Sequence, residues 1–207
     1  MYPNIYLASQ SPRRAELLKQ IGVPFELLLA DQSEDAESLE ALVGQESPAR
    51  YVARVTELKA IAAQARLAAR ALPFKPILTA DTTVAIGGTM LGKPNDAMDA
   101  ARMLKLLSGR SHRVFTAVCL TYGCKVICAL SVSKIRFSRL SHTQIEQYVQ
   151  SGEPFGKAGA YAIQGLAATF IQKIEGSHSG IMGLPLFETS QLLETYLRTS
   201  QAAALAK

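Results

Sequence analysis

The chain of 207 residues contains no tryptophan, few other aromatic residues (7%) and no run of basic side chains. Proteins that bind single-stranded nucleic acid stack bases on aromatic side chains, so a base-stacking surface is not expected here. The net charge of +5 is compatible with nucleic acid and equally with a small anionic ligand. Without a basic run, this charge does not decide between the two.

Cysteines and long apolar runs are also scarce. Cys119, Cys124 and Cys128 are odd in number, form no C-x-x-C pair and lie in apolar, strand-like stretches. We therefore expect buried, reduced thiols rather than a disulfide set or a zinc site. No apolar run approaches membrane-spanning length, and the N-terminus lacks the pattern of a signal peptide, so a cytoplasmic protein is expected.

The composition that is present favours a globular protein. Hydrophobic residues make up 48% of the chain and charged residues 19%, which allows a substantial core and argues against disorder. No internal repeat or low-complexity linker divides the chain. We expect one domain over residues 1–207, with two lobes around a cleft as a possible arrangement, and an Ala-rich tail over 199–207 that frays.

Strand and helix patterns alternate along the sequence, which predicts an α/β fold with a mixed sheet flanked by helices. Residues 31–46 are acidic and polar and predict a loop or a short mobile helix. Ser47-Pro48 and Ser141–Gln144 are helix-start signals, and Asn95 is a further candidate cap. Expected strands cover 4–8, 25–30, 76–86, 89–91, 112–122, 125–137 and 168–175, and expected helices cover 12–21, 48–71, 96–107, 141–150 and 186–198.

The segment from Leu7 to Glu16 carries the most specific local signal. A strand is followed by Ser11 and Pro12, which suit the N-cap and first position of a helix. Arg13 and Arg14 lie in the first turn of that helix, where free N–H groups and the helix dipole already favour an anion. This junction predicts a phosphate-binding site, although a capped surface helix with two arginines would give the same pattern.

Other polar residues are candidates for a functional site only if the fold brings them together. Asp81, where two β runs are expected to meet, suits a metal ligand or a general base, but an aspartate there is also a common turn former. Gln164, in the Gly-rich stretch 156–166, could bond a base edge, since an amide both donates and accepts. Lys59, Lys93 and Glu34 would by default face solvent. No histidine is assigned a catalytic role.

Six motifs together resemble a known family. They are S-x-S-P-R-R-x-E-L-L at 9–18, A-D-T at 80–82, G-K-P at 92–94, L-S-G-x-x-H at 107–112, K-A-G-A-Y-x-I-Q-G at 157–165 and G-L-P at 183–185. In this order they resemble the Maf family of nucleoside triphosphate pyrophosphatases, over roughly residues 4–197. The resemblance implies a Maf fold, similar to inosine triphosphatase, with a deep cleft.

The resemblance also points to a branch and to site residues. Thr82 after the aspartate and the pattern Y-x-I-Q-G at 161–165 are similar to the dTTP/UTP pyrophosphatase branch, rather than the branch that acts on 7-methyl-GTP. It implies Asp81 as the catalytic carboxylate and Arg13, Thr82 and Gln164 as substrate-discriminating residues. Ser9, Arg14, Glu34, Lys59 and Lys93 match polar positions that line the family's cleft. We expect Ser9, Arg14, Lys59 and Lys93 to bind phosphate, and Glu34 to be a second metal contact beside Asp81. The segment 31–47 is longer and more acidic than is usual in the family.

The implied reaction cleaves the bond between the α and β phosphates and releases a nucleoside monophosphate and pyrophosphate. Asp81 would act on the attacking water or hold a divalent cation, Mg²⁺, Mn²⁺ or Co²⁺, that does so. The family implies a homodimer. Two alternatives stay open: the same reaction on another base, such as 7-methyl-GTP, or a regulatory nucleotide- or nucleic-acid-binding protein in septum formation. Only the last predicts DNA binding with a steep salt dependence.

Overall fold

The computed structural model describes residues 1–31, 34 and 38–205, with the side chains of 203–205 left out. One sheet runs through it, in the order β2-β1-β3-β5-β6-β7, and β4 pairs with β3. The strands are β1 (Ile5–Leu7), β2 (Phe25–Leu27), β3 (Ile77–Ile86), β4 (Thr89–Leu91), β5 (Ser111–Tyr122), β6 (Lys125–Phe137) and β7 (Ile171–Glu175). β1 is parallel to β2 and β3, and the other pairs are antiparallel, so the predicted mixed α/β sheet is confirmed.

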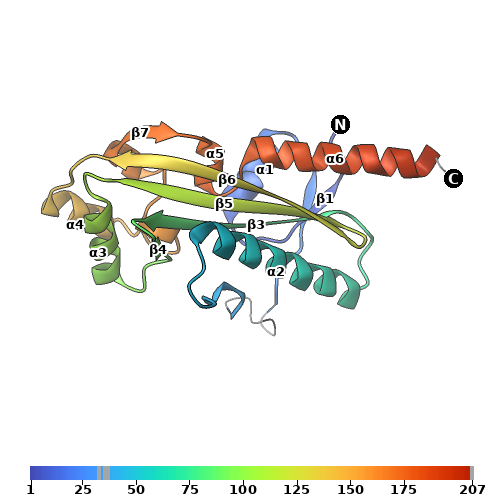
Figure 1. Cartoon of the computed structure of the whole chain (residues 1–207), viewed down its shortest axis with the longest axis horizontal. Helices are drawn as coiled ribbons and strands as arrows, with labels where there is room; N and C mark the ends of the chain where they lie inside the picture. Colours follow the sequence, from blue (N-terminus) through green and yellow to red (C-terminus); the bar gives the residue numbers. More distant parts are fainter. Residues whose placement is uncertain (32–33, 35–37, 206–207) are drawn as a thin grey trace.

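Helices cover both faces of this sheet (Figure 1). The α-helices are α1 (Pro12–Gln20), α2 (Pro48–Ala69), α3 (Ala97–Leu107), α4 (His142–Gln150), α5 (His178–Met182) and α6 (Leu186–Leu205). Short 3-10 turns are η1 (Ser38–Glu40), η2 (Ala158–Ala160) and η3 (Leu166–Phe170). None of the helices in the described part of the chain is long and apolar enough to cross a membrane.

The two faces of β3 are covered by different helices because side chains alternate along a strand. Leu78 and Ala80 pack with α1 and α6 residues such as Leu18 and Leu193. Ile77 and Ala85 lie on the other face, where Ala63 and Val52 of α2 cover them. A separate cluster joins α3, α4 and the far ends of the long strands.

The sheet has an opening beside the middle of β3. β1 pairs with β3 only at Ile77 and Leu78, and β4 pairs with it only from Val84 onward. Among the described residues, the β3 segment 79–83 therefore has a strand partner on one edge only, namely β5. The carboxyl end of β1 and the start of α1 face this opening, which is the kind of place where open α/β sheets bind ligands.

Several boundaries differ from those expected. Asp81 lies inside a ten-residue strand and pairs with Ala117, rather than at a junction between two β runs. Asp96, not Asn95, caps α3 by accepting a bond from the Asp99 amide. α6 continues to Leu205 instead of ending near 198. Residues 168–170 belong to η3, so β7 begins at Ile171, and α5 was not expected.

The expectation for the cysteines was wrong. Cys119 and Cys128 are directly opposite each other in the β5–β6 ladder, with Cα atoms 4.1 Å apart, and form a disulfide. Cys124 lies at the hairpin turn and is exposed. The cross-strand register that creates this pair depends on where the hairpin turns, and the spacing of the cysteines does not show it.

Candidate active site

A cavity of about 760 Å³ occupies the opening in the sheet. It is lined from the end of β1, the start of α1, α2, β3, η1 and the segment 156–165. Eight of the predicted site residues line it, which are Ser9, Arg13, Arg14, Lys59, Asp81, Thr82, Lys93 and Gln164. The fold thus brings together residues that are up to 155 positions apart in the sequence, Ser9 and Gln164 being the two extremes.

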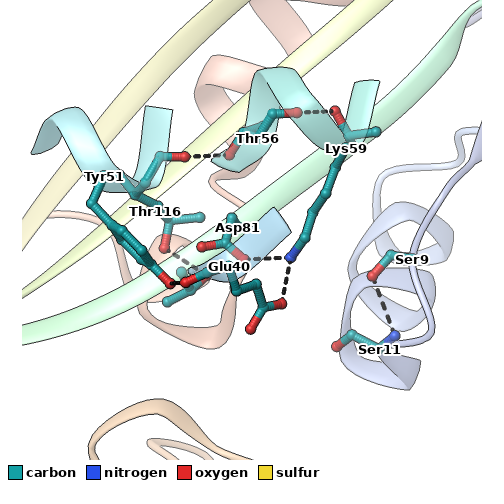
Figure 2. A network of polar contacts seen from close by, with 12 residues as sticks. Ser9, Ser11, Glu40, Tyr51, Thr56, Lys59, Asp81 and Thr116 are labelled. Carbon is teal, nitrogen blue, oxygen red and sulfur yellow. Dashed lines mark hydrogen bonds and ion pairs between the residues drawn. The ribbon is translucent and has the colours of Figure 1, made fainter. Parts of the chain in front are cut away.

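Lys59 lies between two carboxylates at one side of this cavity (Figure 2). Its ammonium donates to Asp81 Oδ1 at 2.7 Å and to Glu40 Oε1 at 2.8 Å. Asp81 is only 7% exposed, so this ion pair gives a largely buried carboxylate a partner of opposite charge. α2 covers the face of β3 from which the odd-numbered side chains project. Lys59, on α2, therefore lies on the same side of the sheet as the Asp81 side chain.

Glu40 was not among the predicted site residues. Its carboxylate also accepts from Lys93 at 3.3 Å, and its backbone carbonyl accepts from the Tyr51 hydroxyl at 3.0 Å. Although burial acts to raise the pKa of Glu40, the contacts with Lys59 and Lys93 hold it below its usual value. Burial, together with the charges of Asp81 and Glu40, raises the pKa of Tyr51 to about 12. The ionised Glu40 therefore neutralises two lysines that were predicted to bind phosphate.

Arg14 is fixed at the carboxyl end of β1. Its guanidinium donates to the Gly183 carbonyl at 2.8 Å, to Ser9 Oγ at 2.9 Å and to Thr82 Oγ1 at 3.5 Å. Burial lowers the pKa of Arg14, and the charge of Asp81 opposes that effect. Ser11 is the N-cap, as predicted, but its side chain makes no capping bond and its amide donates to Ser9 Oγ instead. Ser9 thus organises both the helix start and Arg14.

Thr82 and Asp81 are neighbours on β3 that point to opposite faces of the sheet. The Thr82 hydroxyl bonds that of Thr116 at 3.0 Å and lies beside Arg14. Thr116 in turn donates to the Gly180 carbonyl of α5 at 2.7 Å. Both β3 side chains reach the cavity because the strand edge between them is open.

Arg13 and Gln164 line another part of the cavity. Arg13 is partly buried, and burial lowers its pKa while the charges of Glu16 and Glu153 oppose that effect. Gln164 is exposed and follows the buried residues Tyr161, Ala162 and Ile163. Gln164 is therefore an exposed residue next to a packed segment, and it lines the cavity, where its amide could bond a ligand.

Glu34 does not line the cavity. Its carboxylate accepts two bonds from Arg66, at 2.7 and 2.6 Å, and Arg66 also donates to the Leu28 carbonyl. The hydrogen bond from Arg66 lowers the pKa of Glu34. This arrangement attaches the start of the acidic segment to α2. Residues 32–33 and 35–37 of that segment lie outside the described residues.

His112, from the motif at 107–112, is part of the support of the site. Its Nε2 lies 2.8 Å from the hydroxyl of Tyr161, and both rings pack against Phe137. Its Nδ1 is buried without a hydrogen-bond partner among the described residues. Burial lowers the pKa of His112 to about 4, so the imidazole is neutral in the folded protein at pH 7.

This burial predicts a loss of stability in mild acid. The pKa of His112 is about 4 when folded and about 6.5 when unfolded. Between those values the unfolded state binds more protons, so stability falls as pH falls from about 6.5 to about 4, by about 3 kcal/mol in all. Urea unfolding at pH 7 and pH 5 measures about 2 kcal/mol of this loss, because pH 5 still lies above the folded pKa. His112→Gln should lose less stability over this step than the wild type, and an equal loss would contradict the assignment.

The donor atoms present suit a hard divalent cation bound together with substrate. The described residues contain no group of three or more His, Cys, Asp or Glu side chains that could hold a metal alone. Mg²⁺ is commonly held by one or two carboxylates plus substrate phosphates. Asp81 and Glu40 already face a shared cationic group, Lys59, so their oxygens fit that pattern.

These features first define a class: an α/β protein with a cavity that is lined by cationic side chains and by a carboxylate on a strand. The chain belongs to the Maf-like protein family, whose sequence model matches residues 4–196. The resemblance predicted from the motifs is thereby confirmed.

Curated relatives are similar over almost the whole chain. A dTTP/UTP pyrophosphatase of Ralstonia nicotianae is 63% identical, covering 93% of each chain. A dTTP/UTP pyrophosphatase of Cupriavidus pinatubonensis is 60% identical, covering 93% of this chain and 96% of the relative. Among solved structures, the Staphylococcus aureus Ham1 protein matches 95% of this chain and 99% of its own, with 12% identity and a TM-score of 0.47.

Proposed function

We propose that this protein is a nucleoside triphosphate pyrophosphatase that hydrolyses dTTP and UTP to the monophosphate and pyrophosphate. The observation that carries the proposal is the cavity that Arg14, Lys59 and Lys93 line together with Asp81. A triphosphate carries about four negative charges, and its cleavage is catalysed chiefly by positioning and charge stabilisation. The names of the relatives support dTTP and UTP as substrates.

Each side chain receives a role in this reaction. Asp81 is the carboxylate that acts on the attacking water. Ser9 and Arg14, fixed at the start of α1, bind the phosphate chain, and Lys59 and Lys93 stabilise the charge of the leaving pyrophosphate. Arg13, Thr82 and Gln164 set substrate preference. Thr82 would act through Arg14, which its hydroxyl contacts.

We also propose a divalent cation, Mg²⁺, Mn²⁺ or Co²⁺, held by Asp81 and the substrate phosphates. When bound, it neutralises charge on the phosphate oxygens. Glu34 was the predicted second contact, but its carboxylate is bonded to Arg66. Glu40 is better placed for that role, since it shares Lys59 with Asp81.

Product analysis tests the reaction. UTP is incubated with the protein in Mg²⁺, Mn²⁺ or Co²⁺, or in EDTA, and followed by ³¹P NMR. Pyrophosphate and UMP should form in a metal-dependent manner. Formation of inorganic phosphate and UDP would place cleavage at the other bond, and no turnover with any metal would favour the regulatory binding alternative.

The role of Gln164 predicts a change of base preference. Uracil and thymine present the O4 acceptor, whereas cytosine presents an amino donor at that position. Gln164→Glu replaces an amide that can donate with a carboxylate that only accepts, so kcat/KM for CTP should rise relative to UTP by about tenfold or more. Parallel kinetics with both nucleotides measure the ratio. An unchanged ratio in a folded variant would contradict base reading by Gln164.

We further propose that the protein acts in the cytoplasm as a homodimer. Among the described residues, the β6 segment 125–133 pairs only with β5, because β7 joins at Lys134. On this segment Val126, Leu130 and Val132 are exposed by 42%, 41% and 46%. An unpaired strand edge beside exposed apolar side chains favours protein association. Sedimentation should show a dimer, and replacing Leu130 and Val132 by lysine should give a monomer. A wild-type monomer would contradict it.

A further inference from the structure

The base-reading residue Gln164 lies on a loop that is held in place by an acidic side chain from another segment. The loop runs from Ala162 to Ala167 and includes the first two residues of η3. Glu153, which follows α4, lines the same cavity. Neither the six motifs quoted above nor the predicted site residues include Glu153. Its contacts with the loop join residues 13 and 14 positions apart, so they depend on the fold.

The Glu153 carboxylate makes three contacts with the loop and its support. Oε2 accepts from the Leu166 amide at 2.9 Å. Oε1 accepts from the Tyr148 hydroxyl at 2.8 Å and from the Ala167 amide at 3.4 Å. The Tyr148 hydroxyl also accepts from the Ala162 amide at 3.3 Å. Glu153 and Tyr148 therefore bind both ends of the loop that carries Gln164.

The backbone of the loop needs such support. A Cβ atom at Gly165 would lie 2.3 Å from both carboxylate oxygens of Glu153, so the loop approaches this side chain as closely as only glycine allows. Upstream, Ala160 is buried and has a φ of 59°, in the left-handed region that non-glycine residues rarely adopt. Tertiary contacts, rather than local preference, determine this conformation.

Glu153 is an acidic side chain in the lining of a cavity that is proposed to bind an anion. A negative charge in the lining of a cavity that binds a triphosphate opposes substrate binding. Both carboxylate oxygens are already bonded to the loop and Tyr148, which leaves Glu153 suited to shaping the loop rather than to bonding the substrate.

We propose that Glu153, acting with Tyr148, is a positioning residue that sets pyrimidine selectivity by holding the loop 162–167 so that Gln164 faces the base. This inference rests on the proposed function, because it deepens the role of Gln164 in the same site. It assigns Glu153 no contact with the reacting atoms. The phosphate-binding side of the cavity should therefore be independent of it.

Three variants and a control separate positioning from general damage. Glu153→Ala removes all three carboxylate contacts, and Tyr148→Phe removes only the hydroxyl shared by Glu153 and Ala162. Glu153→Gln keeps an acceptor oxygen for the loop amides but removes the charge. Glu146→Ala is the matched control, because Glu146 is an exposed glutamate on α4 that pairs only with His142 among the described residues.

The first readout is the ratio of kcat/KM for UTP to that for CTP. Glu153→Ala should lower it about tenfold or more, chiefly through a higher KM for UTP. Tyr148→Phe should lower the ratio by a smaller factor. In the double variant, Glu153→Ala with Tyr148→Phe, the ratio should fall by less than the product of the two single factors, because the two side chains share one contact. Glu153→Gln and Glu146→Ala should stay within about threefold of the wild type.

The second readout is competitive inhibition by inorganic triphosphate, which has no base. Its inhibition constant should stay within about twofold of the wild type in Glu153→Ala, since the phosphate contacts are separate. A parallel loss of triphosphate binding would show that the whole cavity collapses and would overturn the proposal. An unchanged UTP-to-CTP ratio in Glu153→Ala would overturn it as well.

Binding measurements keep this inference distinguishable from the proposed function. Calorimetry with α,β-imido-UTP and α,β-imido-CTP, which resist cleavage at the bond in question, gives the same ratio as affinities. If the wild type hydrolyses no nucleotide but Glu153→Ala still loses the preference for the uridine analogue, the proposed reaction fails and the positioning role holds. If the wild type cleaves UTP and neither ratio changes in the variant, only the positioning role fails.

Discussion

Replacing Asp81 by asparagine is expected to lower kcat for dTTP by roughly 10²–10⁴-fold, the usual loss when a positioned acid or base is removed. The asparagine side chain would keep the size of the original and an oxygen for the contact that Lys59 now makes with Asp81. It would remove the negative charge that acts on the attacking water. Because Ser9 and Arg14 are the proposed ligands of the phosphate chain, KM should change little.

Steady-state kinetics and calorimetry with α,β-imido-UTP measure the two effects separately. Glu146→Gln, an exposed change on α4, serves as the matched control and should behave as the wild type. Turnover near the wild-type level in Asp81→Asn would remove Asp81 from the catalytic role. A loss of binding as large as the loss of kcat would indicate that Asp81 is needed to organise the cavity instead.

Replacing Lys59 by methionine is expected to lower kcat/KM for dTTP by roughly 10²–10³-fold, the range found when one stabilising donor is removed. The ammonium of Lys59 is 2.7 Å from Asp81 and 2.8 Å from Glu40. Without it, two carboxylates would be left facing the position of the phosphate chain. Both the binding of the anion and the stabilisation of the leaving group should suffer.

Lys93→Met is the comparison for this variant. Lys93 contacts Glu40 alone among the carboxylates of the described residues, and its side chain is 57% exposed, so the loss should be closer to about tenfold. Values of kcat/KM for Lys59→Met within about threefold of the wild type would contradict the role of Lys59.

The helix starts could be predicted from local sequence patterns. Ser47-Pro48 and the capping box at Ser141 begin helices where predicted, because their signals depend on residues one turn apart. α1 also begins where Ser11-Pro12 predicts, although the Ser11 side chain makes no capping bond. Asn95 and Asp96 are both good caps, and only the structure shows that Asp96 accepts the Asp99 amide.

The parts that could not be predicted depend on register and on long-range packing. The Cys119–Cys128 pair requires the β5–β6 register, and the gap beside residues 79–83 requires the lengths of two neighbouring strands. Glu34 and Glu40 lie in the same acidic segment. Their spacing does not show that Glu34 pairs with Arg66 and Glu40 with Lys59. The family resemblance supplied the set of residues, and the fold supplies their partners.

The proposed reaction is selective hydrolysis of dTTP and UTP in this cavity, between the α and β phosphates. Its most direct test is pyrophosphate release from a panel of dTTP, UTP, CTP, 7-methyl-GTP, dGTP and ATP, compared as kcat/KM at one fixed metal concentration. We expect the highest values for dTTP and UTP, with pyrophosphate as the product. A clear preference for 7-methyl-GTP or another nucleotide would contradict it.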